Sequence, residues 1–216
     1  MLCGSGRFDG SEIHESVLTL LHLDRAGASV RCFAPDAAQW AVCDAFTGTP
    51  IPGATRNMLQ ESARIARGAV EPLAHACGKD LDALILPGVS GAAHNLGTFA
   101  TSGASGTLVP DLERLILECL ALQRPIGAIC IAPALLALAL RGRHPRLTLG
   151  PLDRAPATEA AATGATLLDC AVDGIVVDEQ LRLVSTPAYV LARSIAEADR
   201  GIERLVREVL RLVRPR

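Results

Sequence analysis

Cys130 is the residue with the clearest potential for chemistry, because of its place in the stretch "PIGAICIAPALLALAL". A short apolar run stops at this cysteine, and a second segment rich in Ala and Leu begins directly after it. A residue at a tight strand-to-helix turn projects from the sheet, and the free N–H groups that open the helix favour a thiolate over a thiol. The pattern predicts a reactive cysteine, with a small buried residue as the alternative.

A second strand end lies in "LPGVSGAAHNL", residues 86–96. The turn at Gly88 could aim backbone amides at an oxyanion near Cys130 if the two strands are neighbours, although Gly and Pro after a strand often form a turn and nothing else. His94 and Asn95 follow this turn and are candidate pocket residues, with a surface position as the alternative for His94.

Two carboxylates open the first expected helix, after the loop "CGSGRFDGSE". Glu12 is a candidate pocket residue, but a capping role explains it equally well. Glu15 lies off the apolar stripe of that helix, which consists of Ile13, Val17, Leu20 and Leu21. Periodicity therefore favours a solvated Glu15, and only its closeness to the strand ends favours a site.

These residues can form one site only in a fold that brings strand ends together. Short apolar runs alternate with longer amphipathic runs along the chain, which predicts an α/β fold with a mostly parallel sheet and helices on both faces. We expect one domain over residues 1–216, an edge hairpin within residues 174–187, and a first strand that is either very short or begins upstream of Met1. The expected strands are 29–34, 81–88, 126–129 and 146–150, and the expected helices are 12–26, 57–65, 110–123, 132–140 and 188–213.

Composition excludes several classes of function. A net charge of −2 and a pI near 6.2 provide no basic field for nucleic acid or anionic membrane, so a small molecule is the expected partner. Lys79 is the single lysine and lies in a turn-like stretch, which argues against Schiff-base catalysis. The seven dispersed cysteines contain no C-x-x-C pair, and no signal peptide or membrane-spanning run is present; we therefore expect a cytoplasmic protein with reduced thiols and no bound metal.

The histidines exclude one further mechanism. A Cys-His-Glu glutaminase carries its His and Glu late in the chain as H-x-E, whereas the last histidine here is His144 and no H-x-E is present.

The motifs in combination resemble the ElbB-type glyoxalase branch of the PfpI-like superfamily, which is class I glutamine amidotransferase-like. The resemblance runs from Leu2 to about Leu210 and rests on "GSGRFDGSEIHESVLTLLHLDRAGA", "TRNMLQESARIARG", "CIAPALL" and "VDGIVVDEQLRLVSTPAYVLARSIAEADRGI". It implies a flavodoxin-like three-layer sandwich, a homodimer, a nucleophilic Cys130 and a hydrogen bond from Glu15 to that cysteine. It also implies an oxyanion hole formed by the backbone amides of Val89 and Ile131.

Two residues depart from the family pattern. Val89 stands where the family has a second glycine, and its β-branched side chain resists a positive φ. Ile131 replaces the histidine of the protease-like members, which argues against peptidase activity.

The expected activity is a glyoxalase without cofactor that converts glyoxal or methylglyoxal to glycolate or lactate. A redox-sensing or regulatory protein with an oxidisable Cys130 is one alternative, and repair of aldehyde-glycated amines is another.

Overall fold

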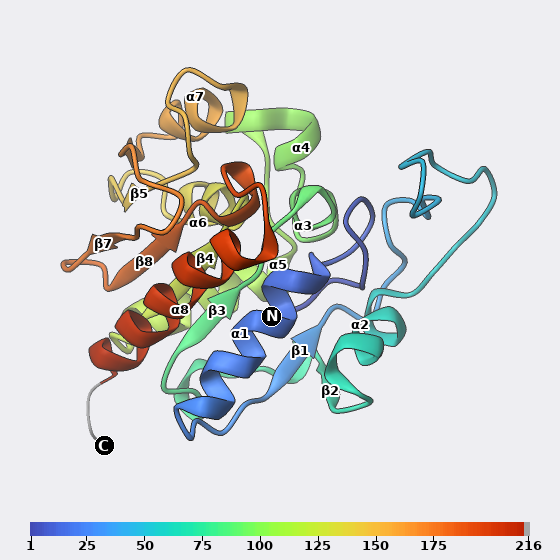
Figure 1. Cartoon of the computed structure of the whole chain (residues 1–216), viewed down its shortest axis with the longest axis horizontal. Helices are drawn as coiled ribbons and strands as arrows, with labels where there is room; N and C mark the ends of the chain where they lie inside the picture. Colours follow the sequence, from blue (N-terminus) through green and yellow to red (C-terminus); the bar gives the residue numbers. More distant parts are fainter. Residues whose placement is uncertain (214–216) are drawn as a thin grey trace.

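A four-stranded sheet forms the centre of the computed structural model, which describes residues 1–213 (Figure 1). Its order is β3 (Leu84–Leu86), β4 (Ile126–Ile129), β8 (Leu183–Thr186) and β7 (Val176–Asp178). β3, β4 and β8 run parallel, and β7 pairs antiparallel with β8. The predicted α/β class, the parallel sheet and the edge hairpin are confirmed.

Two smaller sheets flank this centre. β1 (Cys32–Ala34) pairs in parallel with β2 (Val70–Pro72), and β5 (Arg146–Leu147) pairs in parallel with β6 (Thr166–Leu167). The Met1 amine donates to the Ile85 carbonyl and the Leu2 N–H donates to the Phe33 carbonyl, while β1 and β3 belong to separate sheets.

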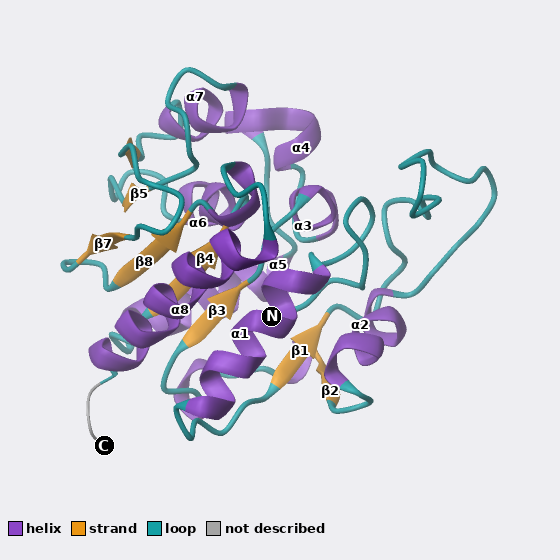
Figure 2. Cartoon of the chain, viewed as in Figure 1, coloured by secondary structure: helices purple, strands orange, loops and turns teal. Residues whose placement is uncertain are grey.

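Helices cover both faces of the central sheet (Figure 2). On one face lie α1 (Ile13–Arg25) and α8 (Ile195–Leu212), and Ile129 and Val184 of the sheet pack against α8. The side chains that α8 contributes to this core are Ile202, Leu205, Val206 and Val209.

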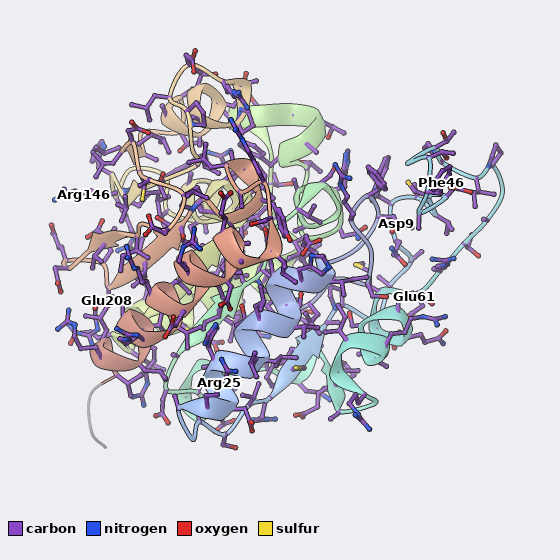
Figure 3. The ribbon with its side chains drawn as sticks, viewed as in Figure 1. Asp9, Arg25, Phe46, Glu61, Arg146 and Glu208 are labelled. Atoms are coloured by element: carbon purple, nitrogen blue, oxygen red, sulfur yellow. The ribbon has the colours of Figure 1, made fainter. Side chains whose placement is uncertain are left out.

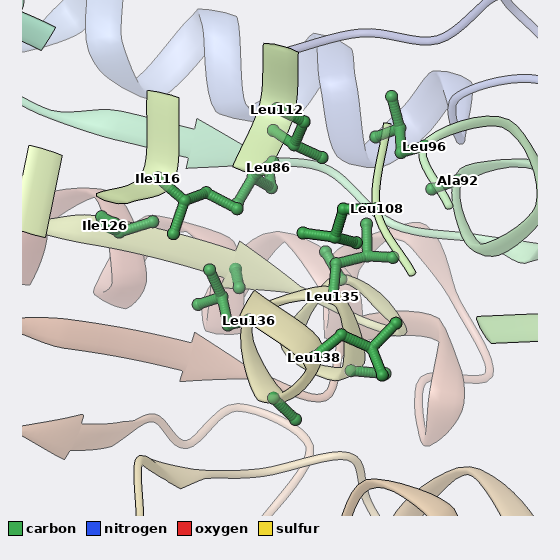
Figure 4. Packing of buried hydrophobic residues seen from close by; sticks show 14 of the residues in the cluster. Leu86, Ala92, Leu96, Leu108, Leu112, Ile116, Ile126, Leu135, Leu136 and Leu138 are labelled. Carbon is green, nitrogen blue, oxygen red and sulfur yellow. The ribbon is translucent and has the colours of Figure 1, made fainter. Parts of the chain in front are cut away.

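The opposite face carries α5 (Pro110–Ala121) and α6 (Ala132–Ala139). Figure 4 shows Leu112 and Ile116 of α5 and Leu135 and Leu136 of α6 packed with Leu86 and Ile126 of the sheet. Successive residues of β4 point to opposite faces of the sheet, so the strand packs against the helices on both faces and is fully buried.

The remaining helices are short and lie mainly around the carboxyl ends of the strands. They are α2 (Met58–Ala66), α3 (Ser90–Asn95), α4 (Phe99–Ser102) and α7 (Ala155–Ala161), with 3₁₀ turns at Leu73–His75, Gly78–Asp80, Gly103–Ser105 and Ala188–Val190. The expectation that the last helix begins near residue 188 was wrong. That segment is a 3₁₀ turn, and α8 starts after Ser194, whose side chain accepts a hydrogen bond from the Glu197 N–H as an N-cap.

The first helix is turned opposite to the expectation from its apolar stripe. Ile13, Val17 and Leu21 are exposed, whereas the buried positions of α1 are Glu15, Ser16, Thr19 and His22. Each hydroxyl bonds a carbonyl one turn back, and His22 Nε2 lies 2.7 Å from Asp199 Oδ1 on α8. The buried hydroxyls and the imidazole of α1 are thereby satisfied. Glu15 is buried on the same side of the helix, so the expectation of a solvated Glu15 from periodicity was wrong.

A long irregular segment between β1 and α2 projects from the body, with Phe46 near its tip (Figure 3). Within residues 1–213 no helix combines the length and the apolar character needed to cross a membrane.

Candidate active site

Cys130 lies in a strained turn between β4 and α6. Its φ of 61° is in the left-handed region, and its N–H donates to the Thr186 carbonyl at 3.0 Å. A non-glycine residue in this conformation projects sharply from the sheet, as at a nucleophile elbow. The side chain is 6% exposed and lies at the wall of a cavity.

The turn after β3 lies against this elbow, because β3 and β4 are adjacent and Leu86 pairs with Ala128. A Cβ atom on Gly88 would approach the Ile129 carbonyl oxygen to 2.3 Å, so only glycine fits there. The backbone amides of Val89 and Ile131 act on the Cys130 sulfur and lower the pKa of its thiol. The structure thus brings together the two amides that the sequence resemblance assigned to an oxyanion hole.

Val89 has φ 90° and ψ 168°, a region of backbone space used almost only by glycine. The β-branched side chain makes this conformation still less favourable. Val89 therefore supplies the same backbone amide as a glycine would, but its backbone is strained.

Glu15 is fully buried beside the elbow, and two reciprocal hydrogen bonds hold it there. The Gly88 N–H donates to Glu15 Oε2 at 2.9 Å, and the Glu12 N–H donates to the Gly88 carbonyl at 3.3 Å. The other carboxyl oxygen, Oε1, is buried and has no partner at ordinary hydrogen-bond geometry within residues 1–213. The Cys130 thiol and the Tyr189 N–H also act on this carboxyl and favour its charged form.

Burial is the main cause of the protonation behaviour of this pair. It raises the pKa of Glu15 from 4.5 to about 7, against the opposing effect of the Gly88 N–H. Burial first, and then the charge of Glu15, raise the pKa of the Cys130 thiol, although the Val89 and Ile131 amides lower it. The expected standing thiolate is therefore corrected to a thiol with a carboxyl group beside it, since burial outweighs the helix amides.

The cavity at Cys130 has a volume of about 1050 Å³. Its wall combines the sulfur with the side chains of Glu12, His14 and Tyr189, and Arg7 and Arg193 lie at exposed positions of the lining. His14 Nδ1 and the Tyr189 hydroxyl lie 2.7 Å apart. Glu12 lines the cavity and also has a structural role, because its carboxylate caps α1 by accepting the Glu15 N–H at 2.8 Å.

Two candidate pocket residues have structural contacts instead. His94 stacks on Trp40, with ring centroids 3.9 Å apart, and does not line the cavity. Asn95 is buried, and its amide group donates to the carbonyls of Cys3 and Asp9. Through these two bonds Asn95 fixes the loop that leads into α1.

That loop is fixed from a second side. Asp9, which lies between the body and the projecting segment in Figure 3, accepts the Cys43 N–H at 2.8 Å through its carboxylate. The Gln39 side chain also donates to the Asp9 carbonyl. The loop before Glu15 is therefore fixed through both the backbone carbonyl and the side-chain carboxylate of Asp9.

Sequence reasoning missed Tyr189 and Arg193 as cavity residues. Both follow the carboxyl end of β8, so the rule that ligands bind beyond strand ends applies to "STPAYVLAR" as well. Expecting a helix from residue 188 obscured this signal. Within residues 1–213 no group of three or more His, Cys, Asp or Glu side chains could hold a metal ion.

Comparison with known proteins gives relatives of similar length. No protein-family model matches the chain. The glutamine amidotransferase-like class 1 domain-containing protein 3, mitochondrial, of Homo sapiens is 41% identical over 218 residues, which cover 98% of this chain and 81% of the relative. The isoprenoid biosynthesis protein with amidotransferase-like domain from Ehrlichia chaffeensis superposes with a TM-score of 0.91 and 31% identity, over 99% of this chain and 97% of that one.

A more distant structure shares the fold alone. Glyoxalase III from Candida albicans superposes with a TM-score of 0.65 at 10% identity, over 99% of this chain and 95% of that one. Together with the Ehrlichia structure, it agrees with the predicted flavodoxin-like sandwich.

The comparisons overturn one prediction. The relatives from Homo sapiens, Rattus norvegicus and Danio rerio are all named as mitochondrial proteins, which contradicts the expected cytoplasmic location. That expectation rested partly on dispersed cysteines, which report redox conditions rather than a compartment.

Replacing Val89 with Gly is expected to stabilise the fold. The positive φ costs about 1–3 kcal/mol for a non-glycine residue, more than the roughly 0.4–1 kcal/mol that glycine adds to the entropy of the unfolded chain. Urea denaturation should show a higher midpoint. Val109→Gly is the matched control, because Val109 has φ −60° and its replacement should lower the midpoint. A lower midpoint for Val89→Gly as well would show that the turn stores no strain.

The buried Glu15 predicts a pH-dependent stability. Between pH 4.5 and about 7 the folded chain holds a proton on Glu15 that the unfolded chain has lost. The free energy of unfolding should therefore fall as the pH rises through this window, by about 3 kcal/mol, and stay constant above it. Glu15→Gln should lack this decline, and replacement of the exposed Glu113 by Gln should retain it. Parallel curves of unfolding free energy against pH for the wild type and Glu15→Gln would refute the assignment.

Proposed function

The chain belongs to the glutamine amidotransferase-like class 1 family, and on this premise we propose that it is a glyoxalase without cofactor, of the ElbB-type branch. The observation that carries the proposal is the buried Glu15 carboxyl, with a pKa of about 7, beside the Cys130 thiol at the elbow. A cysteine nucleophile and an acid–base group whose pKa lies near neutrality are the two groups that this reaction needs.

In the first step Cys130 adds to one aldehyde carbon of glyoxal or methylglyoxal. Glu15, ionised near neutral pH, takes the thiol proton as the carbon–sulfur bond forms. The aldehyde oxygen becomes an alkoxide, which the Val89 and Ile131 amides stabilise until Glu15 returns the proton to it, so that a hemithioacetal forms and Glu15 is again ionised.

In the second step a proton moves between the two carbons. The carbon bonded to sulfur loses its hydrogen as a proton to Glu15, an enediol forms, and the neighbouring carbon is protonated. The result is a thioester with a hydroxyl group on the second carbon. Water then cleaves the carbon–sulfur bond, which releases glycolate or lactate and restores the thiol. Overall, one dicarbonyl and one water give one 2-hydroxy acid, with no net oxidation and no cofactor.

The site disfavours the glutaminase chemistry that the family name suggests. Among the described residues His14 is the one histidine that lines the cavity, and its Nδ1 lies against the Tyr189 hydroxyl rather than the cysteine. Glu15 is the group placed to act as base, which suits proton transfer between adjacent carbons.

The protonation state of Cys130 favours turnover over redox sensing. A sensor requires a standing thiolate, because the thiolate is the form that peroxide oxidises. Burial and the charge of Glu15 hold the Cys130 pKa high, so the resting thiol is protected. An enzyme with an adjacent base needs the thiolate only during attack, which fits this pair better.

The cavity volume favours a second candidate, removal of a dicarbonyl from a larger adduct. A volume of about 1050 Å³ lies at the upper end for small-molecule sites and far exceeds a molecule of two or three carbons. Amine or thiol adducts of methylglyoxal would occupy more of it through the same hemithioacetal chemistry.

Replacing Cys130 with Ser should abolish formation of glycolate from glyoxal, as measured by chromatography of the product. The control is Cys170→Ser, which changes a partly exposed cysteine outside the cavity lining and should keep the wild-type rate. The wild-type rate should rise as the pH passes about 7, because Glu15 must be ionised to take the thiol proton. A Cys130→Ser variant with full activity would exclude the mechanism.

The adduct candidate predicts activity in the presence of an aldehyde scavenger. Lactate release from the hemithioacetal of methylglyoxal and N-acetylcysteine should continue under excess aminoguanidine if the adduct binds directly. Complete suppression, with free methylglyoxal still turned over when no scavenger is present, would leave the free aldehyde as the substrate.

A further inference from the structure

Two arginines of the cavity wall have guanidinium groups without a polar partner among residues 1–213. Arg7 comes from the loop before α1, and Arg193 comes from the segment between β8 and α8. The Arg7 guanidinium lies over the Phe8 ring, 5.0 Å from its centroid, which leaves its N–H groups available. On the outer surface, by contrast, the Arg114 guanidinium lies 2.9 Å from the Glu118 carboxylate. The cavity wall therefore presents two cationic groups that can bind a ligand.

The segments that carry these arginines are fixed and are joined to each other. The Arg193 N–H donates to Glu197 Oε2 at 2.8 Å, which ties this residue to the start of α8. The two segments meet at the cavity wall, where His14 Nδ1 and the Tyr189 hydroxyl lie 2.7 Å apart. Because one arginine precedes this contact in its segment and the other follows it, both belong to the part of the wall that these segments build. A ligand whose reacting end lies at Cys130 can therefore extend toward them.

The carboxylates of the wall, unlike the guanidiniums, already accept hydrogen bonds from the backbone. Glu12 Oε2 accepts the Glu15 N–H at 2.8 Å, and Glu159 Oε2 accepts the Ala104 N–H at 3.0 Å. Backbone N–H groups that point at a carboxylate offset part of its negative charge. Glu197, at the start of α8, does not line the cavity. The charges of the wall that have no protein partner are therefore positive, which favours an anionic ligand.

The cavity also has room for more than the reacting carbons. A dicarbonyl of two or three carbons on Cys130 leaves most of the volume of about 1050 Å³ open. Small side chains of α4 and α7 form part of the remaining wall, among them Ala100, Thr101, Ser102 and Ala155. Because these side chains are short, they leave space for a further group on the substrate.

We propose that Arg7 and Arg193 form an anion-binding subsite of the cavity, and that the substrate is a dicarbonyl compound or adduct that carries a carboxylate or a phosphate group. A planar guanidinium binds either group through paired N–H donors, so these two anions are its best-matched ligands. The inference rests on the proposed function, which puts the reacting carbons at Cys130. It adds the class of compound, because an anionic group distinguishes such a substrate from free glyoxal and methylglyoxal.

The test measures binding without turnover, in the Cys130→Ser chain. The probes are acetonyl thioethers, which keep the carbon skeleton of a methylglyoxal–thiol adduct but cannot release the dicarbonyl. They are made from mercaptopropanoate and the longer mercaptohexanoate, from the amides of these two acids, and from mercaptoethyl phosphate. Each amide matches its acid in size and lacks the charge. Isothermal titration calorimetry at neutral pH gives the dissociation constants.

At least one anionic probe should bind about tenfold or more tightly than the neutral amides, because hydrogen bonds to a charged group are the stronger ones. Arg7→Gln and Arg193→Gln should each reduce this preference, and the double variant should abolish it. Arg200→Gln is the matched control, since it removes the same charge from an exposed position of α8 outside the cavity lining and should keep the preference. The tighter anion, carboxylate or phosphate, then identifies the group that the substrate carries.

Equal binding of acids and amides, no binding of any probe, or an anion preference that persists in the double variant would overturn the proposal. Turnover of glyoxal and methylglyoxal by the chain with Cys130 intact tests the proposed function separately. Turnover combined with equal binding of acids and amides would remove the subsite alone. Arginine-dependent binding without turnover of any dicarbonyl would exclude the glyoxalase and keep the anion subsite.

Discussion

The rest of the site depends on the buried carboxyl group of Glu15 and its hydrogen bond from the Gly88 N–H. This bond, with the return bond from the Glu12 N–H, ties the first turn of α1 to the turn after β3. Once that contact is fixed, α1 must present its polar side to the protein, which explains why Ile13, Val17 and Leu21 face outward. The orientation of the helix follows from the needs of one acid group rather than from its apolar stripe.

The sequence was sufficient for features that local pattern determines. The position of Cys130 in the turn between β4 and α6 was predictable, because the strand end and the helix start are both visible in adjacent residues. The neighbouring turn at Gly88 was predictable for the same reason. Glu15 was misplaced by periodicity, since its burial depends on partners more than 70 positions away in the chain, and only the family resemblance identified it. His94 was beyond prediction because its contact with Trp40 joins α3 to the irregular segment after β1. The homodimer implied by the resemblance stays a prediction.

Burial has opposite consequences for Glu15 and Cys130, the two residues that we propose to be catalytic. It brings the acid to a pKa near neutrality, where a proton can leave and return readily, and it keeps the sulfur protonated at rest. Exposure to water would remove the burial that raises both pKa values, so Glu15 would become an ordinary carboxylate and the pKa of the Cys130 thiol would fall. Keeping both groups out of water lowers the stability of the fold, as does the positive φ of Val89.

The groups of Val89 and Ile131 that we propose to stabilise the alkoxide are main-chain amides and not side chains. Any residue except proline supplies such an N–H, so mutation at the cavity wall can alter which molecules enter without removing these donors. The tight fit of Gly88 on the Ile129 carbonyl keeps the two amides in place while the wall varies. Descendants of this scaffold could therefore diverge in substrate while the reacting centre is inherited unchanged.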